Sequence, residues 1–407
     1  MKIVESGKCG DNVYYELFES GTLEISGEGR MWNLFYSEPN FSQYANITHV
    51  VVHDGVTSIG DRVFEDCKLL KSIIFANTIK RIGVNAFANC ISLEILEFPQ
   101  SLRKIREEAF YNCTSISSII IPKRVRKIKQ KAFEGCTALA SIEVLSDNIE
   151  LWDDVFSNTA WFNNQPDGCV YINDMLYRYK GKMPPVAHID VRKGTTKICN
   201  GAFDSCFQLK SVHLPDGLIT IDRYAFYYCL ALRVINIPNT VKYIKCYAFN
   251  HCKTLMDISI PSSVIEIGYE AFDFTFWKNN LPDGCVYVND TLYGYKYNGW
   301  EKPKTDNCLI IKEGITRVNR CDDFEFITFP STSKEIEHHA FAPYGVHIPK
   351  IITCLAVKPP IIKYLAPNVY ESGILIRIPK GSKEAYMKHK HWGKFKNIEE
   401  IDIDYFC

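Results

Sequence analysis

The sequence predicts a β-dominated α/β repeat solenoid, and three observations lead to that fold class. Phenylalanines recur every 23 residues from Phe64 to Phe156, and again from Phe203 to Phe272. Cysteines follow many of them three residues later, as in the stretch NAFANC at 85–90. Leu, Ile and Val stand at fixed offsets between the copies. A single period carried through most of a chain is typical of stacked repeats.

One coil, meaning one 23-residue repeat, shows how the period folds. Residues 91–113 begin with L-x-x-L-x-F, the strand pattern of a leucine-rich repeat. Pro99 then ends the strand, because proline has no N–H with which to continue a ladder. A second apolar pair, Leu102 and Ile105, follows, and the A-F motif lies in a short turn. Because one coil cannot bury its apolar face, we expect coils to stack and the stack to be capped.

Three regions depart from the regular coil. Residues 1–46 predict a β-rich N-terminal cap with strands joined near Glu19. Two copies of an aromatic P-D-G-C-V-Y pattern, near 160–181 and 276–299, predict β-hairpins inserted into a solenoid that spans 47–358. Residues 359–407 predict a C-terminal cap with a strand, a short helix and a final strand.

The composition narrows the function classes. Lys and Arg total 47, as do Asp and Glu, so no net charge favours nucleic acid as a partner. No run approaches 18 apolar residues, so we expect no membrane span. The first residues contain no apolar signal region, so an export signal is absent from this chain or has been removed. No motif for a nucleophile, a metal or a phosphate loop occurs, so we expect no catalytic residue, cofactor or metal.

The repeat cysteines have several interpretations. A zinc site would need clustered thiols, and no C-x-x-C is present. Neighbouring coils bring cysteine Cα atoms within disulfide range, but the Cβ atoms of in-register strands stay too far apart. We favour a ladder of buried free thiols, with some disulfides left open as the alternative.

The repeat unit C-x-x-L-x-x-I-x-I-P-x-x-V-x-x-I-x-x-x-A-F resembles the BspA-like leucine-rich repeat proteins. The segment at 9–31, the W-[FK]-N-N-x-P-D-G inserts and the IPKGSKEAY stretch are similar to family features. The resemblance covers nearly the whole chain. It implies a non-enzymatic adhesion or protein-binding function and a surface or secreted location.

Three surfaces are candidates for ligand binding. The first, the basic column, stands at matching repeat positions: Lys80, Arg81, Arg103, Lys104, Arg126 and Lys127. The second, the strand face, consists of the outward residues of the repeat strands, among them Ser118, Ile120, Glu143, His213 and Asn236. The third is the pair of hairpins with Trp161 and Trp277. For the column and the hairpins, the competing interpretations are a solvated charged face and aromatic packing onto the solenoid.

From these surfaces we expect a protein partner, on a host cell, in extracellular matrix or on a neighbouring cell. The alternative is a glycan-binding module that uses the aromatic hairpins or the basic column, with an anionic glycan as ligand.

Overall fold

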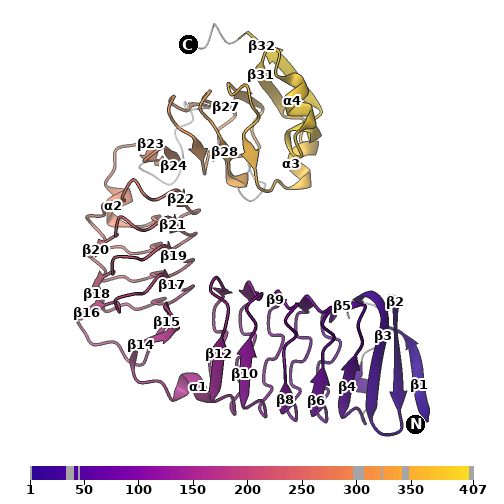
Figure 1. Cartoon of the computed structure of the whole chain (residues 1–407). Helices are drawn as coiled ribbons and strands as arrows, with labels where there is room; N and C mark the ends of the chain where they lie inside the picture. The colour runs from indigo at the N-terminus through magenta and orange to yellow at the C-terminus, as the bar shows by residue number, and fades with distance from the viewer. Residues whose placement is uncertain are drawn as a thin grey trace. The chain divides into compact units, whose positions relative to one another are not determined.

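The computed structural model describes residues 2–33, 41–44, 46–296, 307–321, 324–341 and 348–402. It forms two compact units, which we describe separately. Unit 1 comprises Met1–Lys182 with Lys197–Ala202, and unit 2 comprises Met183–Thr196 with Phe203–Cys407. Figure 1 shows the short stacked strands of the coils in each. The expected β-dominated repeat solenoid is therefore confirmed.

Unit 1 begins with three antiparallel strands, β1 (Ile3–Lys8), β2 (Gly10–Phe18) and β3 (Thr22–Met31). The first half of β3 pairs in parallel with β4 (His49–Val52), and its second half pairs with β5 (Val56–Ser58). One long strand thus starts both sheets of the solenoid, which is how the N-terminal segment covers the open end of the first coil.

Two parallel sheets run along the coils of unit 1. The first contains β4, β6 (Ser72–Ile74) and β8 (Ile95–Leu96), and β10 (Ser118–Ile121) pairs with β12 (Ser141–Val144). The second contains β5, β7 (Arg81–Ile82), β9 (Lys104–Ile105), β11 (Lys127–Ile128) and β13 (Glu150–Leu151). Each strand aligns with the one 23 residues before it, as the period predicts.

The phenylalanine ladder fills the corner of each coil. Phe87, Phe110 and Phe133 are fully buried, and their rings lie parallel with centroids 5.2 and 5.3 Å apart. The backbone follows the same ladder, because the N–H of each Phe donates to the carbonyl of the residue before the Phe of the next coil, as from Phe87 to Ala109 at 2.8 Å and from Phe133 to Val155 at 2.9 Å. Offset aromatic pairs at this distance add to the burial of each ring.

The repeat cysteines are free thiols, as favoured from the sequence, and all of them are buried except the half-buried Cys206. The Sγ donates to the carbonyl of the Phe in the preceding coil, for example from Cys113 to Phe87 at 3.0 Å and from Cys136 to Phe110 at 3.1 Å, and the same bond is made by Cys90, Cys229 and Cys252. Burial raises the pKa of Cys113 well above its ordinary value, and that of Cys136 to about 12. These cysteines therefore serve packing and hydrogen bonding.

The first insert begins with helix α1 (Ala160–Asn163) and continues in the hairpin of β14 (Gly168–Ile172) and β15 (Met175–Lys180). Strand β17 (Lys197–Ile198) then pairs with β15. Thr159 stands where a regular coil has Cys, and its Oγ1 accepts the N–H of Phe162 at 3.1 Å. Thr replaces Cys here because the insert begins with a helix, and a threonine hydroxyl accepts a free N–H at the start of a helix.

Unit 2 repeats this plan. One sheet holds β16 (Ala187–Asp190), β18 (Leu209–His213) and β20 (Val234–Asn236), and the other includes β19 (Thr220–Ile221), β21 (Tyr243–Ile244) and β22 (Glu266–Ile267). The second insert consists of α2 (Phe276–Asn279), capped by Thr275, with the hairpin of β23 (Gly284–Val288) and β24 (Thr291–Lys296). The last residues predicted for it, 297–299, lie outside the described residues.

The chain after the second insert forms two more sheets. One contains β25 (Cys308–Ile310), β27 (Phe326–Phe329), β29 (Ile351–Cys354), β31 (Leu375–Pro379) and β32 (Asn397–Ile401). The other contains β26 (Arg317–Val318), β28 (Glu335–Ile336) and β30 (Ile361–Ile362). Helices α3 (Pro367–Glu371), α4 (Lys383–Lys388) and η4 (Trp392–Lys394) close this end, with Tyr386 of α4 and Trp392 of η4 fully buried. The domain boundaries at residues 46 and 358 stay predictions.

Candidate binding surfaces

The basic column lies on the second sheet of unit 1. Arg81, Lys104 and Lys127 are aligned in β7, β9 and β11. Lys80, Arg103 and Arg126 precede them by one residue, and the N–H of each of the last two donates to the carbonyl of the cation before it, at 2.9 and 2.8 Å. All six predicted residues are thus brought together in two adjoining rows.

Two of the six cations already have partners. Arg81 pairs at 3.2 Å with Asp61, a carboxylate that is only 4% exposed and also receives Arg106 at 3.1 Å. Lys127 pairs with Glu150 at 2.7 Å, and Glu150 ends the column where the next coil begins. Burial lowers the pKa of Arg81 from its ordinary value, with Asp61 acting in the opposite direction.

The other four cations reach solvent without a carboxylate partner among the described residues. Lys80, Arg103 and Arg126 are exposed, and Lys104 is half-buried. This division matters because a cation without a carboxylate partner can bind an anionic ligand directly, whereas a cation in an ion pair is already neutralised by its partner. The sequence could not supply it, since Asp61 is 20 residues from Arg81 and 45 from Arg106.

The strand face of unit 1 combines exposed isoleucines with acidic residues. Ile74, Ile95 and Ile120 are 62%, 60% and 53% exposed. Glu97 and Glu143 stand beside them, exposed and without an ion pair among the described residues. A shallow hollow of about 310 Å³ lies between Ile74, Ile95 and Phe98. Ser118 is exposed on the same face, next to Ser141 in register.

The strand face of unit 2 is more polar. His213 is aligned with Asp190 on one side and with Asn236 on the other, and all three are exposed. One row away, His188 Nδ1 lies 2.5 Å from Ser211 Oγ. The predicted residues His213 and Asn236 therefore share one surface of unit 2, whereas Ser118, Ile120 and Glu143 belong to unit 1.

The two tryptophans predicted to lie in the hairpins stand instead on the short helices α1 and α2 that precede them, and they pack onto the solenoid. Trp161 is half-buried and its ring centroid lies 5.7 Å from Phe156, while Trp277 lies 5.5 Å from Phe272. Both contacts are edge-to-face, so the indoles extend the phenylalanine ladder past its last coil. This placement covers part of each indole ring with the solenoid.

Each hairpin also replaces a missing backbone partner. The N–H of Phe156 would meet a carbonyl of the next regular coil, and instead it donates to the hydroxyl of Tyr177 at 3.0 Å. The N–H of Phe272 donates to the hydroxyl of Tyr293 at 2.8 Å. Both tyrosines are 3% exposed. A side chain from the insert thus satisfies the last N–H of each ladder.

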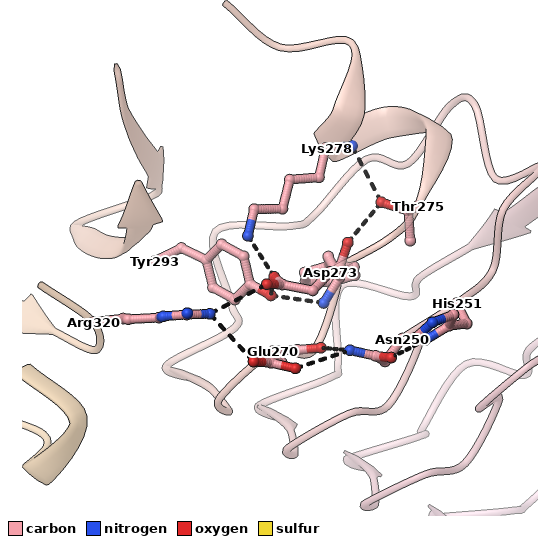
Figure 2. A network of polar contacts seen from close by, with 9 residues as sticks. Asn250, His251, Glu270, Asp273, Thr275, Lys278, Tyr293 and Arg320 are labelled. Atoms are coloured by element: carbon pink, nitrogen blue, oxygen red, sulfur yellow. Dashed lines mark hydrogen bonds and ion pairs between the residues drawn. The ribbon is translucent and has the colours of Figure 1, made fainter. Parts of the chain in front are cut away.

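A buried polar network surrounds the second of these tyrosines, as Figure 2 shows. Asp273 accepts from the Tyr293 hydroxyl at 2.7 Å and from Lys278 Nζ at 2.5 Å. Arg320 reaches Asp273 at 3.4 Å and Glu270 at 3.3 Å. Because Arg320 follows the insert and Glu270 precedes it, the network holds the two sides of the insertion together.

An aromatic ladder in unit 2 went unnoticed in the sequence. Tyr228, His251 and Phe274 are 23 residues apart, with ring centroids 4.3 Å apart at each step. All three have positive φ, between 55° and 61°, in positions where unit 1 uses Asn89 and Asn112. Bulky residues rarely adopt this conformation. The aromatic residues that form this ladder can be read from the repeats YAFYYC (224–229) and YAFNHC (247–252), but the sequence did not reveal their positive φ.

Metal sites and membrane spans are two further possibilities for the described parts of the chain. No group of three or more His, Cys, Asp or Glu side chains there is placed to hold a metal ion. Within the same residues, none of the helices has the length and apolar character needed to span a membrane.

Comparison with known proteins identifies the repeats. A model of the BspA type leucine rich repeat region matches residues 37–162 and 175–296, in six copies. No protein with a curated description matches the chain.

Solved structures with similar repeats include a leucine-rich repeat protein from Eubacterium ventriosum, with 21% identity over 73% of this chain and 97% of that one, at a TM-score of 0.33. A leucine rich cell surface protein from Faecalibacterium prausnitzii is 19% identical over 91% of this chain and 97% of that one, at a TM-score of 0.31. A leucine-rich repeat protein from Bacteroides ovatus is 17% identical over 96% of this chain and 99% of that one, at a TM-score of 0.32. The family model covers more than half of the sequence. The chain therefore belongs to the BspA-type leucine-rich repeat family.

Proposed function

We propose that the chain is a non-enzymatic binding protein that acts at the cell surface or after secretion. Its partner is a protein on a host cell, in extracellular matrix or on a neighbouring cell. The location and the adhesive role rest on the resemblance of the repeats to BspA-like proteins. The strand face of unit 1 is the surface that supports this function best.

The observation that carries the proposal is the exposure of Ile74, Ile95 and Ile120. Each leaves more than half of its side chain in water on a sheet whose backbone is fixed by neighbouring coils. Apolar residues that are held rigidly at a surface lose little conformational entropy when a partner covers them. Glu97 and Glu143 on the same face add polar selectivity, so the face suits a protein segment with apolar and basic side chains.

The test uses binding to a panel of purified extracellular matrix proteins and to intact host cells. We expect I74S/I95S to weaken binding by at least about tenfold, which corresponds to ~1.4 kcal/mol. The matched control is I219S/I265S, because Ile219 and Ile265 are 43% and 46% exposed in unit 2. Equal losses in both variants, or none in the first, would rule out the strand face of unit 1.

The glycan alternative that relied on the hairpins receives less support. Trp161 and Trp277 contact the phenylalanine ladder, so W161A and W277A should leave glycan-array binding unchanged while they lower stability. A loss of glycan signal in stably folded W161A and W277A would restore that alternative.

A further inference from the structure

We propose that unit 1 has a second binding site, for a linear sulfated polysaccharide, on its second sheet. The site consists of the four unpaired cations of the basic column, Lys80, Arg103, Lys104 and Arg126. This proposal does not depend on the protein-binding function, because it uses the other sheet and a different type of ligand.

The first argument is the surplus charge. Like charges on neighbouring strands repel and destabilise the pairing. In the column Lys80, Arg103 and Arg126 succeed one another in three coils that are hydrogen-bonded together, and no carboxylate among the described residues lies between them. Within the column, Asp61 and Glu150 pair only with Arg81 and Lys127, and Asp61 also pairs with Arg106 outside it. An anionic ligand would relieve the remaining repulsion.

The second argument is geometric. Adjacent parallel strands lie about 4.8 Å apart, so the row from Lys80 to Arg126 extends over about 10 Å in a straight line. A linear chain with evenly repeated sulfate and carboxylate groups can follow such a row. Two of the four cations are arginines, whose planar guanidinium groups bind these anions through paired hydrogen bonds. The short length predicts modest affinity for one chain segment.

The third argument separates a polysaccharide from other anions. Non-specific binding of single-stranded nucleic acid normally combines a cationic groove with exposed aromatic rings on which bases stack. A membrane surface would favour exposed apolar side chains that insert among lipids. Within residues 78–82, 101–106 and 124–129 no large hydrophobic side chain is exposed. The charges alone define the site.

The experiment measures binding of the full chain to immobilised heparin by surface plasmon resonance at low and moderate salt. We expect R103S/R126S to bind at least about tenfold more weakly than the wild-type chain. The matched control, K68S/K71S, removes the same charge from exposed lysines next to strand β6 and should change affinity less than about twofold. Counterion release from about four contacts predicts about a 100-fold loss of affinity between about 50 and about 200 mM salt.

Three results would overturn the proposal: no binding of heparin by the wild-type chain, equal losses in both double variants, or tighter binding of single-stranded oligo-dT than of heparin. The last would indicate nucleic acid instead. The I74S/I95S variant should retain heparin binding in full, so failure of the strand-face proposal and failure of this one can be told apart. Unfolding curves of each variant confirm that the surface substitutions leave the fold intact.

Discussion

Substitution of Tyr293 by Phe tests whether the insert completes the backbone hydrogen bonding of the last regular coil. The hydroxyl accepts the buried N–H of Phe272 at 2.8 Å and donates to Asp273 at 2.7 Å. Burial raises the pKa of Tyr293 well above its ordinary value, so the hydroxyl keeps the proton that it donates. Removing the oxygen leaves the N–H with no acceptor, which costs about 1–3 kcal/mol. Asp273 loses one donor but keeps Lys278 and Arg320, which adds about 1 kcal/mol.

The free energy of unfolding should therefore fall by about 2–4 kcal/mol in Y293F. The matched variant Y177F breaks only the bond from the Phe156 N–H, so its loss should be smaller by about 1 kcal/mol. Y14F removes a hydroxyl from a side chain that is 44% exposed and should change stability by less than about 0.5 kcal/mol.

Urea denaturation followed by circular dichroism measures the differences, and hydrogen exchange should show faster exchange of the Phe272 amide in Y293F. Losses in Y293F and Y177F no larger than that in Y14F would refute the role given to the hydroxyls.

Three further predictions concern the ladders. F110A should lower the unfolding free energy by about 3–5 kcal/mol in urea denaturation, because Phe110 is fully buried between two stacked rings, and a loss below about 1 kcal/mol would contradict the packing. Cys113 should resist iodoacetamide in the native chain at about pH 8 while exposed Cys308 reacts, as read by peptide mass spectrometry; equal labelling would exclude a buried thiol. Burial lowers the pKa of His251, and the positive charge of Lys253 lowers it further. As the pH falls, the unfolded chain therefore binds the proton before the folded chain does. The free energy of unfolding should then fall as the pH drops below about 6.5. H251N should reduce this pH dependence in denaturation curves at about pH 7.5 and 5.5, and an unchanged slope would refute the assignment.

Sequence periodicity predicted the coils because every coil buries the same residue types at the same offsets. Phe87, Phe110 and Phe133 could be aligned from their spacing alone, and so could Arg103 with Arg126. The pairing of Arg81 with Asp61 could not be predicted, since it depends on how far each side chain reaches across a neighbouring coil.

The hairpin aromatics show the same limit. The sequence revealed two equivalent copies, but an aromatic strand can turn its rings outward or inward. Inward packing of Trp161 was one of the two interpretations, and the structure places its ring against Phe156. Likewise, the 23-residue spacing of Tyr228 and His251 was visible, whereas their left-handed backbone was not.

The alanine acceptors of the phenylalanine ladder have a consequence for the length of the protein. The N–H of Phe203 donates to the Ala225 carbonyl, and that of Phe226 donates to the Ala248 carbonyl, both at 2.8 Å. Deletion of residues 225–247 would bring Ala248 to the place of Ala225, and every backbone partner would be renewed by an identical group. Such a shortened chain should still unfold cooperatively in urea, because each repeat contacts only its neighbours. Whole coils between the inserts can thus be added or deleted without a change in the core packing. The length of the binding surface can change over evolution in the same way.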